Sequence, residues 1–230
     1  MQQKINQQNN FFYMTFALVG LLVSSSLVEV MPQGILEYVL ETFTVITFIV
    51  CLRSLRFDRR WYHFMVMLVV SWFIATLVRN VLDIKVMDLL MLSFMFAFFW
   101  GTFSSVARQI LFVGHVDRNK IIGSIALFLL LGLMWSLIYL FILEFSPHSF
   151  TGVEPAAWGD NFSQMAYFSF VTLTTLGYGD ISPVTPFAQV AVYMEAIVGV
   201  FYMAIVVASL VSAGQARPED SEQLKPTEDE

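Results

Sequence analysis

Long apolar segments separated by short polar breaks run through most of the chain. Six of them reach the length of about 20 residues that an α-helix needs to cross the hydrocarbon core of a bilayer. The breaks hold proline, glycine or charged residues, such as Pro32, Gly34 and the run from Arg53 to Arg60. The pattern predicts an all-α membrane protein with six transmembrane helices, over residues 11–31, 34–52, 61–79, 86–107, 121–143 and 185–212.

A shorter apolar and aromatic stretch, at 158–173, lies between the fifth and sixth of these segments. It is too short to cross a bilayer, and Thr-Thr-Leu-Gly-Tyr-Gly-Asp follows it directly at 174–180. Irregular backbone is tolerated at membrane depth only where protein or water surrounds it. We therefore predict a re-entrant pore helix over 158–173, capped at its start by Asp160 or Asn161, and an irregular segment over 174–180.

The two glycines of this segment, Gly177 and Gly179, permit backbone conformations that a side chain forbids. Successive carbonyl groups can then face one axis, and a ring of such carbonyls replaces the hydration shell of a potassium ion. The hydroxyl of Thr175 can add one more oxygen. A tight extracellular loop that holds two glycines is the alternative interpretation.

The segment resembles the selectivity filter of the potassium-channel superfamily, which reads Thr-Val/Ile-Gly-Tyr-Gly, with Leu176 in place of Val or Ile. Thr172, Asp180 and Pro183 extend the resemblance. It covers 121–212, about two-fifths of the chain, and is similar to the pore modules of small bacterial channels with six helices and a voltage-gated-like topology. It implies that K⁺ binds at the filter positions Thr175, Leu176, Gly177, Tyr178 and Gly179.

Four neighbouring residues are expected to support the filter: Thr174, Asp180, Tyr167 and Phe168. The resemblance places Tyr167 and Phe168 where the family has an aromatic pair that braces the filter. The Tyr167 phenol can donate a hydrogen bond to Asp180, or it packs against the fifth helix with its hydroxyl at a lipid or water interface. Many family members carry Glu where this chain has Val171, so a Glu–Asp coupling behind the filter is not expected.

The last helix supplies candidates for a hinge, a cavity and a gate. Gly199 falls nineteen residues after Asp180, where the resemblance puts a flexible glycine, and close packing is the alternative role. One face of this helix is expected to line the cavity. Val207 and Val211, the last two residues of that face, are expected near an inner mouth that apolar side chains can gate by dewetting. The members of the face are Val200, Met203, Ala204, Val207 and Val211.

Glu195 is an acid deep in the same apolar helix. At about 100° per residue it points roughly 140° away from Val200, behind the pore. Acids within the membrane are candidates for function by default. We expect a protonated or hydrogen-bonded carboxyl that faces hydroxyls of the pore helix, such as those of Ser169 or Thr172.

One filter segment per chain cannot close a ring, and the chain has no second copy of it. A homotetramer with fourfold symmetry follows. We expect potassium ions, the lipid bilayer and further copies of the chain as partners, and no nucleic acid. Apart from K⁺ in the filter we expect no cofactor or metal, since Cys51 is the only cysteine. The sequence contains no recognisable nucleophile–base pair, phosphate loop or metal cluster, so we do not expect an enzyme.

The first four helices, over 11–107, resemble a voltage-sensor bundle in number and topology only. Residues 86–107 contain no Arg and no Lys, so we predict no steep voltage gating. Residues 108–120 form either an interfacial linker helix that couples this bundle to the pore domain at 121–214, or a plain cytoplasmic loop.

Acidic residues near the predicted outer side are expected to face headgroups or to pair with Arg79 and Lys85. They are Glu29, Glu37, Glu41 and Asp88. His148 in the outer loop and His115 in the inner linker are candidates for proton sensing, a role that lone histidines seldom have.

Basic residues are distributed asymmetrically between the two predicted sides. With segment 1–10 and the acidic tail 215–230 both in the cytoplasm, ten lie inside and two outside, which agrees with the positive-inside rule. The inner set is Lys4, Arg53, Arg56, Arg59, Arg60, Arg108, Arg118, Lys120, Arg217 and Lys225. With 57% hydrophobic and 13% charged residues the chain does not suit a soluble domain, and we expect a multi-pass protein of the plasma membrane, most simply a bacterial inner membrane.

These observations together favour a potassium-selective channel that conducts K⁺ passively. A weakly selective cation channel, loosened at Leu176, is one alternative. The other is a non-conducting subunit that regulates another channel.

Overall fold

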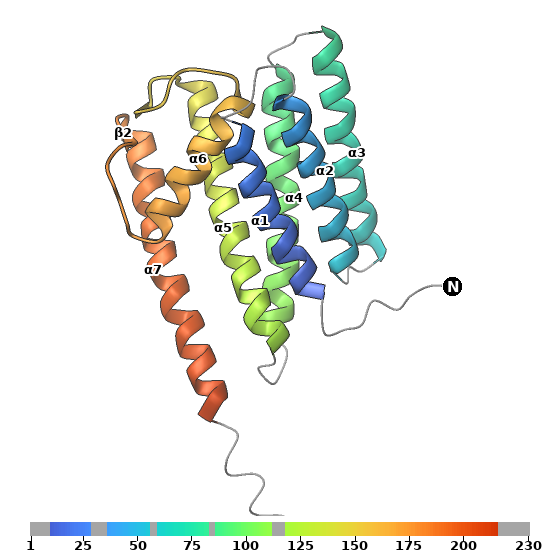
Figure 1. Ribbon diagram of the computed structural model, residues 1–230, viewed down its shortest axis with the longest axis vertical. Coiled ribbons are helices and arrows are strands. Elements are labelled where there is room, and N and C mark those ends of the chain that lie inside the picture. Colours follow the sequence, from blue (N-terminus) through green and yellow to red (C-terminus); the bar gives the residue numbers. More distant parts are fainter. Residues whose placement is uncertain (1–9, 29–35, 56–58, 83–85, 112–117, 216–230) are drawn as a thin grey trace, which may run out of the picture.

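The computed structural model describes residues 10–28, 36–55, 59–82, 86–111 and 118–215 (Figure 1). They form long helices and one shorter helix, together with two paired strands of two residues each. The helices are α1 Asn10–Val28, α2 Leu36–Ser54, α3 Arg59–Leu82, α4 Val86–Leu111, α5 Arg118–Phe145, α6 Trp158–Leu173 and α7 Pro186–Gln215, and the strands are β1 Phe150–Thr151 and β2 Ser182–Pro183. The strands are a small departure from the predicted all-α fold.

Among the described residues, four helices are long and apolar enough to cross a membrane, over Arg59–Arg79, Val86–Ile110, Ile121–Phe145 and Pro186–Val206. Phe11–Leu27 is an apolar helix that falls short of that length. Helix α2 is not among these spans, because the charged residues Glu37, Glu41 and Arg53 fall within its nineteen residues. The helical, membrane-suited character expected from the sequence is therefore confirmed, while six spans remain a prediction.

The predicted linker at 108–120 is divided between its neighbours. Residues 108–111 continue α4 and residues 118–120 begin α5. Residues 112–117, with His115, lie outside the described residues, as do 1–9 and 216–230 of the predicted terminal segments.

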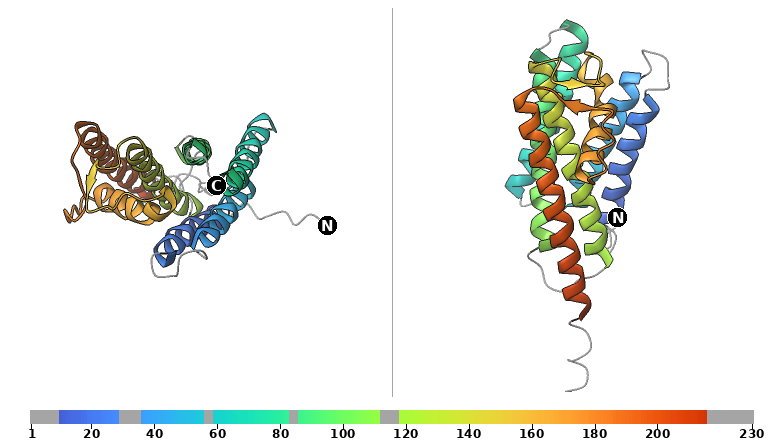
Figure 2. Two further views of the ribbon diagram at one scale, coloured as in Figure 1. Left: turned by 90° about the horizontal axis from the view of Figure 1, so that it is seen from above. Right: turned by 90° about the vertical axis from the view of Figure 1, so that its left-hand side faces the viewer.

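The first five helices form a ring in the order α1, α2, α3, α4, α5, because α5 packs against both α4 and α1. Helix α6 packs on the other side of α5 and also contacts α1, and α7 packs on α5 and α6 (Figure 2). Helix α5 therefore belongs both to the ring and to the α5–α7 group.

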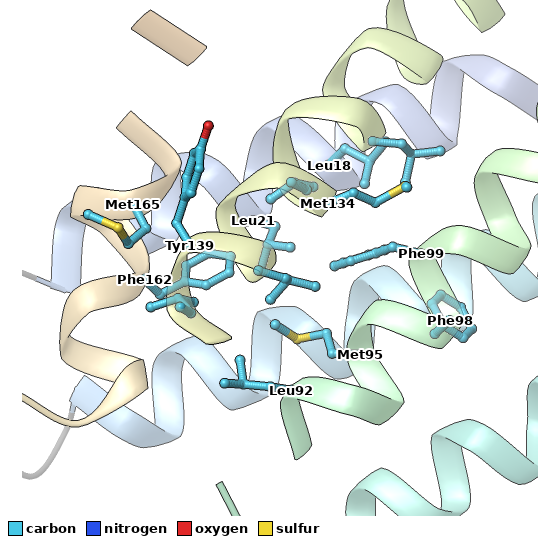
Figure 3. Close-up of a cluster of buried hydrophobic side chains, with 14 of the residues drawn as sticks. Leu18, Leu21, Leu92, Met95, Phe98, Phe99, Met134, Tyr139, Phe162 and Met165 are labelled. Atoms are coloured by element: carbon cyan, nitrogen blue, oxygen red, sulfur yellow. The ribbon is translucent and has the colours of Figure 1, made fainter. Parts of the chain in front are cut away.

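The interior of the ring is apolar and aromatic. Phe48 of α2 contacts the rings of Trp72, Phe98 and Phe99 from α3 and α4. Further buried side chains from α1, α4, α5 and α6 continue this core (Figure 3). In the described parts of α1–α4 no acidic or basic side chain is buried, so these parts bury no charge of the kind that a voltage sensor moves.

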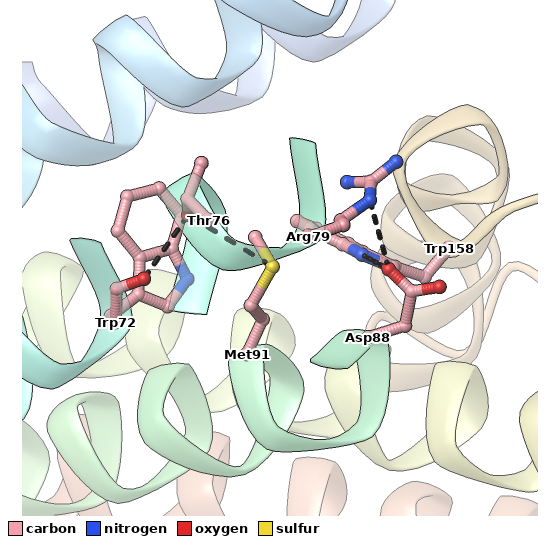
Figure 4. Close-up of polar contacts among 6 residues, drawn as sticks. All are labelled: Trp72, Thr76, Arg79, Asp88, Met91 and Trp158. Carbon is pink, nitrogen blue, oxygen red and sulfur yellow. Dashed lines mark hydrogen bonds and ion pairs between the residues drawn. The ribbon is translucent and has the colours of Figure 1, made fainter. Parts of the chain in front are cut away.

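A polar cluster of Arg79, Asp88 and Trp158 lies between α6 and the end of the ring where α3 and α4 meet (Figure 4). Asp88, in the first turn of α4, pairs with Arg79 of α3 at 3.2 Å between Oδ1 and Nε. The same Oδ1 accepts a hydrogen bond from Nε1 of Trp158, the first residue of α6, at 3.1 Å. The predicted pairing of Asp88 with Arg79 is confirmed, and the bond to Trp158 was not foreseen.

Candidate functional site

Helix α6 spans Trp158–Leu173, the range expected from the sequence, but its start is built differently. Ala157 is the N-cap and no side chain caps it, so the expected capping by Asp160 or Asn161 is wrong. Both residues lie inside the first turns, where Asp160 suits the positive end of the helix dipole. Asn161 Nδ2 instead donates to the carbonyl of Ala156 at 3.3 Å.

The end of α6 unwinds into segment 174–180. The N–H groups of Leu176 and Gly177 both donate to the carbonyl of Val171, at 2.9 and 3.3 Å. The hydroxyl of Thr174 donates back to the carbonyl of Phe170 at 2.6 Å. These bonds tie the first residues of the segment to the last turn of the helix, and they occupy the hydroxyl of Thr174 there.

The backbone of this segment alternates in handedness. Thr175, Gly177 and Gly179 have φ of 62°, 55° and 80°, whereas Leu176 and Tyr178 between them do not have positive φ. Thr175 is the one non-glycine residue with positive φ in the described chain. Alternation of this kind brings successive carbonyl groups to one side of the backbone, whereas an extended strand points them to alternating sides.

A single chain leaves the whole of this segment exposed. All residues from Thr174 to Asp180 are exposed, with Tyr178 at 69% and Leu176 at 58%. A Cβ on Gly177 or Gly179 would meet nothing within 4 Å, so φ and not crowding within the chain requires glycine there. The surroundings that irregular backbone needs at membrane depth are not supplied by one chain.

Both flanks of the segment are held by polar contacts. Tyr167 Oη donates to Asp180 Oδ2 at 2.7 Å, the contact suggested by the sequence, and this bond holds the pKa of the Asp180 carboxyl below its ordinary value. Strand β1 pairs antiparallel with β2, with Phe150 opposite Pro183 and Thr151 opposite Ser182. The loop before α6 is thereby joined to the chain that leaves the segment.

Phe168, the residue after Tyr167, faces the interior of the chain. It is buried and contacts the rings of Tyr139 and Phe150, with centroids 5.2 and 5.5 Å apart. The two residues of the predicted aromatic pair therefore do different things. Tyr167 bonds Asp180, whereas Phe168 fixes α6 to α5 and β1.

Glu195 of α7 is completely buried between α5 and α6. Tyr139 Oη donates to its Oε2, and Ser169 Oγ lies 2.5 Å from its Oε1. The contact with Ser169 was expected from the sequence, whereas the one with Tyr139 was not. A tyrosine in an apolar helix signals a hydroxyl that needs a partner, but the register of α5 against α7 cannot be obtained from either helix alone.

The expected cavity face of α7 is exposed at Val200, Met203 and Ala204. The side chains of Val207 and Val211 lie outside the described part of the chain. Gly199, Val200 and Met203 line one side of a cavity of about 680 Å³, together with Leu173, Thr174 and Thr175. Its other wall comes from α5, at Ile121, Ser124, Ile125 and Phe128. The structure thus brings the predicted hinge, part of the predicted cavity face and the first residues of segment 174–180 to one apolar hollow.

Residues 125–216 match the model of a protein family described as ion channel. The match begins within α5, ends just past α7 and covers about two-fifths of the chain. It includes α6 and the alternating backbone segment. The similarity supports an ion channel, and the apolar helices fit a membrane protein. No curated protein and no solved structure matches the chain.

Proposed function

We propose that the protein is a homotetrameric potassium channel in which four copies of segment 174–180 surround one axis. The observation that carries the proposal is the alternating handedness at Thr175, Gly177 and Gly179, which turns successive carbonyls to one side. Four such rows would supply the oxygen rings that replace the hydration shell of K⁺. The ligands would be the carbonyls of residues 175–179 with the hydroxyl of Thr175.

The exposure of the filter segment and of α7 supports assembly. Within one chain α7 leaves large apolar side chains uncovered, among them Val200, Phe201 and Met203. Three further copies would cover part of this surface, and the bilayer would cover the rest. We infer that the chain spans a bacterial inner membrane six times, with both termini in the cytoplasm. This orientation follows from the excess of basic residues on the inner side, and it also places the filter toward the outside.

The experiment is potassium flux from proteoliposomes that contain the purified protein. We expect a flux that sodium cannot replace and that barium blocks. Gly177→Ala is expected to abolish the flux, because φ of +55° is strained for alanine. Gly159→Ala is the matched control: Gly159 lies on α6 with open space around its Cβ position and no positive φ.

The two alternatives predict other results. A weakly selective cation channel would give similar potassium and sodium fluxes, and Leu176→Val would then raise the preference for potassium. A non-conducting subunit would give no flux and, in native mass spectrometry, no homotetramer. Equal fluxes through the Gly177→Ala and Gly159→Ala variants would contradict a filter at this segment.

A further inference from the structure

Glu195 is the one acidic or basic side chain that is buried in the described parts of the chain. Its two contacts, Tyr139 on α5 and Ser169 on α6, are also completely buried. This burial is complete within one chain, so it does not depend on further copies. Three helices therefore meet at one carboxyl group on the side of α6 that faces α5.

The contacts around this carboxyl form a single path. Tyr139 Oη donates to Glu195 Oε2, and Glu195 Oε1 lies 2.5 Å from Ser169 Oγ. Ser169 Oγ lies 2.8 Å from the carbonyl oxygen of Gly132 on α5. Three hydrogen bonds in a row need three protons. The hydroxyls of Tyr139 and Ser169 supply one proton each.

We propose that Glu195 supplies the third proton, because its carboxyl is neutral and donates to Ser169. The path then runs from Tyr139 to Glu195, to Ser169 and to the carbonyl of Gly132, with each proton used once. An ionised carboxyl would accept the hydrogen bond of Ser169. The Ser169 hydroxyl would then have no proton left to donate to the carbonyl of Gly132. The ionised carboxyl would also place a full charge within an apolar helix, which is costly in a bilayer.

The position of this path relative to the filter gives it a role. Ser169 lies one turn before Leu173, the last residue of α6, and Glu195 lies one turn before Gly199, whose backbone touches Leu173. The neutral carboxyl therefore holds α6 against α5 and α7 directly behind the segment that leaves it. Glu195 is a positioning residue for the filter, an assignment that rests on the proposed function, whereas its protonation does not.

Infrared spectroscopy of the purified protein in lipid tests the protonation independently of conduction. The difference between wild type and Glu195→Gln at neutral pH isolates this one carboxyl. We expect the carbonyl stretching band of a protonated acid, shifted in heavy water, to appear in wild type only. Carboxylate bands in that difference would overturn the proposal, whether or not the protein conducts potassium.

The positioning role is tested by the ratio of sodium to potassium permeability. Glu195→Gln should keep the wild-type ratio, because its amide can donate to Ser169 and its carbonyl can accept from Tyr139. Glu195→Leu and Ser169→Ala break the path and should raise the ratio, whereas Ser163→Ala changes another buried serine of α6 and should not.

Two outcomes would overturn the positioning role. Equal loss of selectivity in Glu195→Gln and Glu195→Leu would mean that the negative charge, and not the proton, is required. Wild-type ratios in Glu195→Leu and Ser169→Ala would mean that the path only fills space. Thermal unfolding of each purified variant separates these results from a failure to fold, since Glu195→Gln should unfold at the wild-type temperature.

Discussion

The Cβ position of Gly199 on α7 lies 2.5 Å from the carbonyl oxygen of Leu173 at the end of α6. A backbone carbonyl cannot rotate away as the end of a side chain can. This carbonyl also belongs to the residue before Thr174, where segment 174–180 begins. The close approach of α6 and α7 thus explains why glycine occupies position 199 without requiring α7 to bend there.

Gly199→Ala separates close packing from bending. Without a clash, alanine in a helix would stabilise the protein by about 1 kcal/mol. We expect the clash with Leu173 to prevail and to destabilise the protein by about 1–3 kcal/mol, the usual cost of overpacking. Thermal unfolding measures the sign, with Gly159→Ala as the control. A more stable Gly199→Ala protein that assembles normally would favour the bending role.

Tyr167→Phe should lower the stability of the protein above about pH 4 and change it little in stronger acid. The hydrogen bond from Tyr167 lowers the pKa of Asp180, so its stabilisation is present above the ordinary value of about 4 and is lost as pH falls through the lowered value. Removal of the donor brings that pKa back toward its ordinary value, so the variant should be less stable than wild type at neutral pH, and the two unfolding temperatures should converge as Asp180 is protonated. Superimposable pH profiles for Tyr167→Phe and wild type would contradict this.

Asp88→Ala should destabilise the junction between the ring and α6. It leaves Nε1 of the buried Trp158 without this acceptor, at a cost of about 1–3 kcal/mol. Asp88→Asn can still accept that bond while it loses the charge that faces Arg79, so its unfolding temperature should lie between those of Asp88→Ala and wild type. Glu154→Ala, at an exposed acid, is the control and should unfold like wild type.

Conductance should depend only weakly on membrane voltage. Each charge that moves through 100 mV contributes about 2.3 kcal/mol, and steep gating needs several such charges. Arg108, which is exposed in the last turn, is the one basic residue of α4. Macroscopic currents in planar bilayers with equal potassium on both sides should therefore lack a steep sigmoid, and Arg108→Gln should leave their shape unchanged.

Local features of this chain could be predicted because they depend on neighbours in sequence. The apolar stretch at 158–173 coincides with α6, and the positive φ values fall at Gly177 and Gly179, where glycine was expected to be needed. The bond from Tyr167 to Asp180 was also within reach, since the two residues flank one short segment.

Contacts between distant helices were not predictable in the same way. Tyr139 meets Glu195, and Trp158 meets Asp88, only because of how α5 and α4 are rotated and shifted against their neighbours. Apolar helices without a strongly polar face do not encode that rotation in their residue pattern. The prediction that Asp160 or Asn161 caps α6 was wrong for a local reason. The helix begins at Trp158, so both residues lie within it and not at the N-cap position.

Helix α5 belongs both to the ring of α1–α5 and to the α5–α7 group that carries segment 174–180. In the proposed channel, a change in the tilt of the ring would therefore also displace α5, which lines one side of the cavity next to Thr174 and Thr175. The packing of α1 and α4 against α5 would transmit such a displacement. The proposed pore would then respond to forces on any helix of the ring, and not only to forces on α5–α7.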